Sequence, residues 1–138
     1  KCFEELILNK VDLSGIILKP NMILSGAQSK ESISSEEVSN KTLECLKNSV
    51  PGEVPGIAFL SGGQTEIEAT QNLNLINKQN NTSFIMTYSY GRALQQSALK
   101  VWSKNIKDIK STQKIFNHRA KMCSLASQGK WSIELEKN

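Results

Sequence analysis

Three short apolar runs, each followed by a segment of helix length, constrain the fold of this chain more than any other feature. The runs are residues 15–20 (GIILKP), 57–60 (IAFL) and 84–89 (FIMTYS). Short continuous apolar runs are typical of strands that are buried on both faces, as in a parallel sheet. Their alternation with helical segments predicts parallel βαβ units.

Helix-start signals bound the first two helical segments. Ser34 followed by Glu37, and Thr65 followed by Glu68, are capping-box patterns that open helices. The second of these helices is expected to end near Lys78. The first should bury the residues that repeat at helical spacing, which are Val38, Thr42, Cys45, Leu46 and Ser49.

Further helices are predicted toward both ends of the chain. Residues 1–10 form a short helix or a helix end with Phe3, Leu6 and Ile7 on one face, and the polar residues 23–33 form a loop. One helix follows Arg92 and runs to about Trp102, and a longer one runs from about 106 to 127 with Gly129 as its cap. The buried face of the long helix is expected to hold Ile109, Phe116, Ala120 and Cys123.

Chain length limits which α/β fold these elements can build. Three parallel strands with helical crossovers do not close into a compact object by themselves. A (β/α)8 barrel typically needs about 250 residues, and this chain has 138. The pattern fits the last three strands and helices of such a TIM barrel, incomplete in this chain. A flavodoxin-like open sheet is the competing architecture.

Composition and charge limit the classes of partner that this chain can have. No apolar run approaches the roughly 20 residues that a transmembrane helix needs, so we expect no membrane partner. The formal net charge is +4, but the Lys and Arg residues are scattered and not interleaved with aromatics. We therefore expect no nucleic-acid partner; a phosphorylated small molecule suits this mild excess equally well.

The cysteines and the single histidine give no sign of a metal centre. Cys2, Cys45 and Cys123 are an odd number of thiols without CxxC spacing, which favours reduced thiols in a cytoplasmic protein. His118 is expected to be a surface residue beside Arg119 rather than a ligand or a base. Metal sites need convergent ligands, and no such cluster is present, so we expect no metal.

Lys19 is the first candidate for chemistry. Active sites of βα barrels and open α/β sheets lie at the carboxyl ends of the strands, and Lys19 ends the first apolar run. Strand alternation puts Ile17 and Lys19 on one side of that strand. Such a lysine either extends into water or, if buried near another cation, becomes a nucleophilic amine.

Two glycine-containing turns follow the other strands. Ser61, Gly62 and Gly63 precede a helix start, where free backbone N–H groups attract anions. Gly91 and Arg92 offer a similar opening with a guanidinium that can bind phosphate. The last two strands of a barrel often bind phosphate in this way, although both segments are also compatible with ordinary strand-to-helix turns.

These residues lie within motifs that closely resemble class I fructose-bisphosphate aldolase. The matching segments are LKPNM (18–22), VPGIAFLSGGQ (54–64), NLNLINK (72–78), SYGRALQ (89–95) and SLASQGK (124–130). They are long, ordered and correctly spaced, and together they extend over nearly the whole chain. The resemblance implies that residues 1–138 are the C-terminal part of a single aldolase barrel domain.

The resemblance also implies a mechanism. Lys19 aligns with the family's Schiff-base lysine, whose amine attacks the ketone of fructose 1,6-bisphosphate. Cleavage then yields glyceraldehyde 3-phosphate and dihydroxyacetone phosphate. The family's ketose-side phosphate site matches Ser61, Gly62, Gly91 and Arg92, with Leu60 beside it through its backbone. The class I mechanism uses no cofactor, and the family enzyme is a cytoplasmic homotetramer that acts in glycolysis.

Departures from the family pattern bear on activity. The family's acid/base carboxylates and other active-site lysines belong to earlier strands, which this sequence lacks. The tail after about residue 130 lacks the family's terminal tyrosine, and residues 23–28 (ILSGAQ) drift from its Pro-Gly-His pattern. We therefore expect negligible turnover from this chain alone. The alternative is an inactive, truncated relative that acts as a phosphosugar- or partner-binding module.

Overall fold

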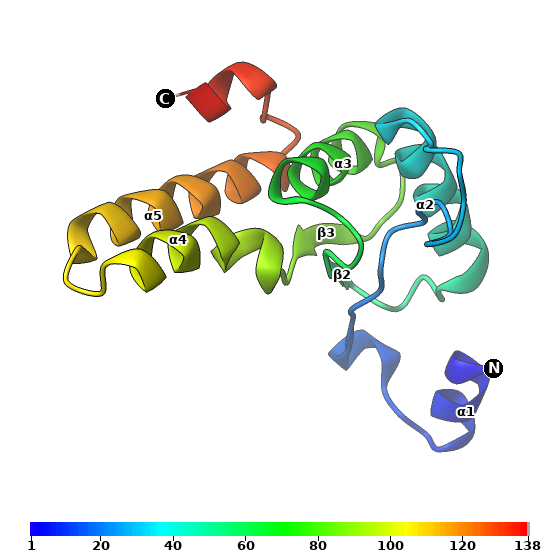
Figure 1. Cartoon of the computed structure of the whole chain (residues 1–138). Coiled ribbons are helices and arrows are strands. Elements are labelled where there is room, and N and C mark those ends of the chain that lie inside the picture. Colours follow the sequence, from blue (N-terminus) through cyan, green and yellow to red (C-terminus); the bar gives the residue numbers. More distant parts are fainter. Residues whose placement is uncertain (138) are drawn as a thin grey trace.

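The computed structural model describes residues 1–137 and contains one parallel three-stranded sheet with helices packed over it (Figure 1). The strands are β1 (Ile17–Leu18), β2 (Gly56–Phe59) and β3 (Ile85–Tyr88), in the spatial order β1-β2-β3. The helices are α1 (Cys2–Leu8), α2 (Ser35–Ser49), α3 (Glu66–Gln79), α4 (Arg92–Lys104) and α5 (Ile109–Ala126), with 3₁₀ turns at Leu13–Gly15 and Ile133–Lys137. Residue 138, the end of the predicted tail, lies outside the described residues.

The two faces of the sheet differ in burial. Ile57 and Phe59 of β2 are fully buried, and Met86 of β3 is buried beside them. The alternate residues are uncovered: Ile17 is 68% exposed and Ile85 is 75% exposed. The prediction of strands buried on both faces is therefore wrong for residues 1–137, because the helices cover only one face.

The first strand is shorter than its apolar run predicts. The first residue of that run, Gly15, ends a 3₁₀ turn over residues 13–15, where the Asp12 carboxylate accepts the backbone N–H of Ser14 at 3.0 Å. Only Ile17 and Leu18 pair with β2, opposite Gly56 and Ile57.

The predicted helix caps are confirmed. The Ser34 hydroxyl accepts the N–H of Glu37 at 3.1 Å. At α3 both halves of the capping box form, since Thr65 accepts the N–H of Glu68 and the Glu68 carboxylate accepts the N–H of Thr65 at 2.8 Å. After α5 the Lys130 N–H donates to the Leu125 carbonyl at 2.9 Å, around Gly129 with its φ of +67°. This is the pattern of a Schellman cap.

Several residues predicted on buried helix faces are exposed. Cys45 and Ser49 of α2 face solvent, since the stripe that packs against α3 holds Ser39 and Leu43 besides the predicted Val38, Thr42 and Leu46. Ile7 is exposed because α1 lies apart from the helical layer (Figure 1).

The long α5 helix departs from its predicted face for a different reason. Ile109 and Phe116 are exposed, whereas Cys123 is buried as predicted. The first half of α5 extends past the sheet beside α4 (Figure 1), so it has no strand to cover. Met122 and Arg119, which the sequence pattern did not single out, are buried further along the helix.

Candidate active site

The three segments predicted to carry chemistry meet at the carboxyl edge of the sheet. The Leu60 N–H donates to the Pro20 carbonyl at 3.0 Å, and the Ser89 N–H donates to the Phe59 carbonyl at 2.8 Å. These bonds continue the parallel pairing past the ends of the strands. The residues that follow β1, β2 and β3 are therefore held next to one another.

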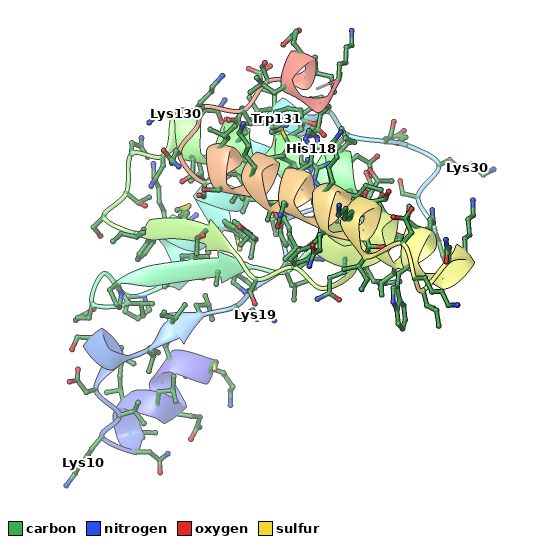
Figure 2. The ribbon with its side chains drawn as sticks, turned by 90° about the vertical axis from the view of Figure 1, so that its left-hand side faces the viewer. Lys10, Lys19, Lys30, His118, Lys130 and Trp131 are labelled. Carbon is green, nitrogen blue, oxygen red and sulfur yellow. The ribbon has the colours of Figure 1, made fainter. Side chains whose placement is uncertain are left out.

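Lys19 lies one residue past β1 and is exposed. By strand alternation it belongs to the same bare face as Ile17. Residues 1–137 thus leave the Lys19 side chain uncovered. Figure 2 shows Lys19 well separated from His118 and Trp131, which lie together near the C-terminal segment.

Asn21 ties the Lys19 segment to the first glycine turn. Its side-chain amide donates to the Gly62 carbonyl at 3.3 Å, and its side-chain oxygen accepts the N–H of Met22 at 3.0 Å. A hollow of about 570 Å³ adjoins this contact, bordered by Asn21, Gly62 and Gly63 among others. Sequence reasoning assigned Asn21 no role, although it stands two residues from Lys19.

The glycines of the two turns differ in what an added side chain would meet. Gly63 has a φ of +79°, which side-chain-bearing residues rarely adopt. A Cβ on Gly62 would come within 3.1 Å of the Leu60 side chain. Gly91, by contrast, has open space where a Cβ would point and no positive φ. The side of Gly91 on which a Cβ would lie is therefore open.

The second glycine turn is anchored to the helical layer. Tyr90 is buried, and its hydroxyl donates to the Ala69 carbonyl of α3 at 2.9 Å. Burial, with smaller contributions from Cys123 and Tyr88, raises the pKa of Tyr90 far above its usual range. Tyr90 is therefore a neutral structural donor that fixes the chain just before Gly91.

Arg92 is the first residue of α4 and is exposed, with no ion pair among residues 1–137. Gly63 and Arg92 border the same hollow of about 500 Å³, so the two predicted anion-binding segments are brought together. Glu66 also borders this hollow, but its carboxylate accepts the backbone N–H of Ser97 at 2.8 Å and the Ser97 hydroxyl. That carboxylate holds α4 against α3.

No metal or disulfide chemistry appears in the part of the chain that is described. Residues 1–137 contain no cluster of three or more metal-ligating side chains. The three cysteines are free, and burial raises the pKa of the Cys123 thiol, which disfavours its reactive thiolate. None of the described helices is both long enough and apolar enough to cross a membrane.

A second polar cluster, away from the candidate site, was missed by sequence reasoning. The Glu136 carboxylate accepts hydrogen bonds from the Arg119 guanidinium and, at 2.7 Å, from the Trp131 indole. The ring Nε2 of His118 lies 3.4 Å from the same carboxylate, so this histidine is half-buried rather than a free surface residue. Burial alone would raise the pKa of Glu136, but these hydrogen bonds and the Arg119 charge outweigh it and lower the pKa.

Comparison with known proteins identifies the family. The family model for class-I fructose-bisphosphate aldolase, a glycolytic family, matches residues 1–138. This chain belongs to that family. It is 45% identical over 130 residues to a probable class 1 fructose-bisphosphate aldolase of Xanthomonas campestris, covering 94% of this chain and 39% of the relative. It is 46% identical over 129 residues to the chloroplastic fructose-bisphosphate aldolase 2 of Pisum sativum, covering 94% of this chain and 37% of that protein.

A solved structure extends the comparison to the fold. The chain superimposes with a TM-score of 0.90 on fructose-bisphosphate aldolase from Plasmodium falciparum, a structure in complex with TRAP and a small-molecule inhibitor. The two are 39% identical, and the match covers 94% of this chain and 38% of that chain. The chain thus spans about two fifths of the length of the aldolases that it matches.

Proposed function

We propose that this chain carries the Schiff-base lysine and the ketose-side phosphate site of a class I fructose-bisphosphate aldolase. The observation that carries the proposal is the hydrogen-bonded carboxyl edge, where Lys19, the Ser61–Gly63 turn and the Gly91–Arg92 turn follow three adjacent strands. Family membership supports the same assignment.

The proposed chemistry begins at the Lys19 amine. The neutral amine attacks the substrate ketone, and loss of water gives an iminium cation. That cation accepts the electron pair of the neighbouring carbon–carbon bond as the bond breaks, while a base from the remaining strands takes the proton of the hydroxyl that becomes the aldehyde. Glyceraldehyde 3-phosphate leaves, and the remaining enamine is protonated and hydrolysed to dihydroxyacetone phosphate and free Lys19.

The phosphate of the ketose end is assigned to the two turns. The backbone N–H groups of Ser61 and Gly62, beside Leu60, and the open side of Gly91 would face its oxygens. The Arg92 guanidinium would add a charge-assisted, bidentate contact. This arrangement fixes the ketone relative to Lys19.

We further propose that β1–β3 are the last three strands of a (β/α)8 barrel and that residues 1–138 belong to that single domain. The apolar bare face, with Ile17 and Ile85, suits the interior of a barrel whose other strands would cover it. A flavodoxin-like sheet carries helices on both faces, whereas the described helices cover one face. The remaining strands would also supply the acid/base carboxylates.

We also propose an oligomeric state and a cellular location for this protein. A homo-oligomer, the tetramer that the resemblance implies, and a cytoplasmic glycolytic role follow from the family assignment. The three free thiols suit a reducing compartment.

Reductive trapping tests the proposal. The folded chain is incubated with dihydroxyacetone phosphate and borohydride, and the adduct is located by intact mass and peptide mapping. We expect the adduct on Lys19, its loss in Lys19→Arg, and no change in the control Lys10→Arg, another exposed lysine. An adduct spread over many lysines, or kept by Lys19→Arg, would contradict the assignment.

A second function, phosphosugar binding without catalysis, is favoured by the exposure of Lys19 and by the absence of any carboxylate paired with it among residues 1–137. General acid–base steps are typically worth about 10²–10⁴-fold in rate. Turnover of fructose 1,6-bisphosphate by the isolated chain should therefore be negligible. Binding of dihydroxyacetone phosphate that Arg92→Ala abolishes, without any Lys19 adduct, would favour this second function.

A further inference from the structure

The helical hairpin of α4 and α5 carries a strongly positive charge. Residues 92–121 hold eight of the chain's 17 Lys and Arg residues and only one of its 13 Asp and Glu residues. Their formal charge is therefore +7, which leaves −3 for the rest of the chain. The positive charge is gathered on one supersecondary unit, although it appears scattered along the sequence.

The single acidic residue of the hairpin is already counted in this +7, and Arg119 is buried and paired with Glu136, so the exposed excess comes mainly from lysines. Asp108 is the N-cap of α5, and its carboxylate accepts the backbone N–H of Ser111 at 3.1 Å. The five exposed lysines nearest the hairpin tip are Lys100, Lys104, Lys107, Lys110 and Lys114.

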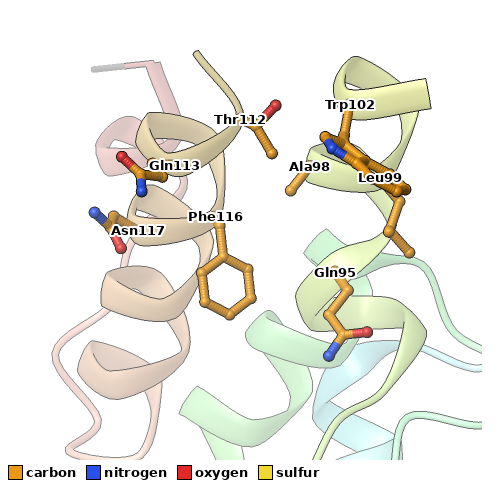
Figure 3. Close-up of a pocket in the computed structure, with 8 residues that line it drawn as sticks. All are labelled: Gln95, Ala98, Leu99, Trp102, Thr112, Gln113, Phe116 and Asn117. Carbon is orange, nitrogen blue, oxygen red and sulfur yellow. The ribbon is translucent and has the colours of Figure 1, made fainter. Parts of the chain in front are cut away.

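An apolar groove lies between the two helices. Its volume is about 460 Å³, and its walls include Ala98, Leu99 and Trp102 of α4 and Phe116 of α5. Leu99 is 50% exposed and Trp102 is 48% exposed, and because both line the same groove they form a patch rather than single exposed residues. Figure 3 shows the Phe116 ring projecting from α5 toward α4, with Ala98 across from Thr112.

The rim of the groove is polar. Gln95 of α4 and Gln113 and Asn117 of α5 also line it, and Figure 3 shows Gln95 on the same side as the apolar residues and the two amides of α5 on the side away from α4. An apolar floor with amides beside it, on a positively charged hairpin, can bind apolar anchors while hydrogen-bonding and pairing with the acidic flanks of the same ligand.

We propose that the α4–α5 groove binds an acidic amphipathic helix of a partner protein. The groove extends along α4 from Gln95 to Trp102, about two helical turns. This length suits a helix that inserts anchors at i and i+4, with further anchors on the next turn. Glu and Asp residues on the partner's flanks meet the lysines of the hairpin.

The concave shape of the groove distinguishes this partner from an anionic membrane surface. Ala98 is buried at the groove, between the larger Leu99, Trp102 and Phe116. A flat lipid surface contacts protruding side chains and leaves a groove between helices empty, whereas a convex helix fills it. A helical peptide is therefore the better fit.

The groove is separate from the proposed phosphate site. The groove begins at Gln95, three positions or about 4.5 Å along α4 from Arg92. None of the residues that line the groove borders the hollow that holds Arg92. Binding at the groove therefore neither needs nor removes the Lys19 and Arg92 chemistry, and the two proposals fail independently.

The test uses a fluorescein-labelled synthetic helix with Leu and Phe at i, i+4 and i+7 and Glu at most other positions. We expect saturable binding to the folded chain by fluorescence anisotropy. The dissociation constant should rise about tenfold or more, equivalent to ~1.4 kcal/mol, in the double variant Lys104→Glu/Lys107→Glu. The control Lys30→Glu/Lys47→Glu makes the same change of net charge outside the hairpin and should leave binding within about twofold.

Two probe controls separate charge from apolar contact. A peptide with Lys in place of Glu and a peptide with Ser in place of Leu and Phe should each bind at least about tenfold more weakly. Equal binding of these peptides, equal effects of the two double variants, or no saturable binding of the acidic helix would overturn the proposal. So would binding to phosphatidylserine vesicles by a chain that does not bind the peptide.

Discussion

The covered and the bare face of the sheet are built from the same strands and both hold isoleucines, yet only one of them is packed. Ile57 of β2 is fully buried, whereas Ile85 of β3, which pairs with Gly56 of β2, is 75% exposed. Side-chain chemistry does not separate these two isoleucines. The difference arises from what covers them. Apolar surface that stays in water contributes none of the stabilisation that burial gives.

Alanine substitution of these two isoleucines should give the largest difference between the faces. Ile57→Ala removes buried methyl groups and leaves a cavity, so it should lower the free energy of unfolding by about 2–5 kcal/mol. Ile85→Ala should change it by no more than about 0.5 kcal/mol. Urea unfolding followed by circular dichroism measures both. Equal losses would mean that the bare face is packed in solution, for instance by association of chains.

A smaller effect is expected from Glu136, which fastens the C-terminal segment to the covering helices. Glu136→Gln removes a charge-assisted hydrogen-bonding partner of Arg119 and Trp131, so the unfolding free energy should fall by about 1.5–3 kcal/mol at pH 7. The control Glu134→Gln alters an exposed carboxylate in the same 3₁₀ turn and should cost less than about 0.5 kcal/mol.

The pH dependence of that effect has a definite sign. Because the folded-state pKa of Glu136 is lowered, its stabilisation is present above the unfolded pKa of about 4.3 and is lost as the pH falls through the folded pKa. The stability difference between the native chain and Glu136→Gln should therefore shrink below about pH 4. A difference that stays constant from pH 7 to pH 3 would contradict the role assigned to this carboxylate.

The smallest effect is expected at Thr65, where the chain passes from the sheet edge into a covering helix. Thr65→Ala removes the hydroxyl that accepts the Glu68 N–H, so unfolding free energy should fall by about 0.5–2 kcal/mol. Thr65→Ser keeps that acceptor and should retain most of the stability. Thermal unfolding distinguishes the two, and equal losses would assign the effect to the methyl group instead of the cap.

The local elements were largely predictable, whereas their packed faces were less so. Ser34, Thr65 and Gly129 define helix ends through hydrogen bonds within a few residues, so the sequence pattern identified them. Ile109 and Phe116 were assigned to a buried face because their spacing is helical. Periodicity reports that a helix has an apolar side, but not whether a neighbour is present to cover it.

Some residues of the candidate site were predictable from the sequence, and others were not. Lys19, Gly62 and Arg92 were selected because residues that follow parallel strands share one edge of the sheet, and the backbone hydrogen bonds at that edge agree. Asn21 and the Arg119–Glu136 pair could not be selected, because each contact joins residues that are far apart in sequence. The roles of Lys19, Gly62 and Arg92 toward the substrate stay predictions, and reductive trapping tests that of Lys19.

By itself the sequence determined the order of strands and helices, the caps that bound them and the residues that follow each strand. These features depend on interactions over a few residues and on the fixed periods of strand and helix. Only the tertiary structure decided which sheet face is covered, that Lys19 stays exposed, and that scattered lysines gather beside an apolar groove on one hairpin. Those outcomes depend on contacts between distant segments, and no local pattern encodes the presence or absence of a covering layer.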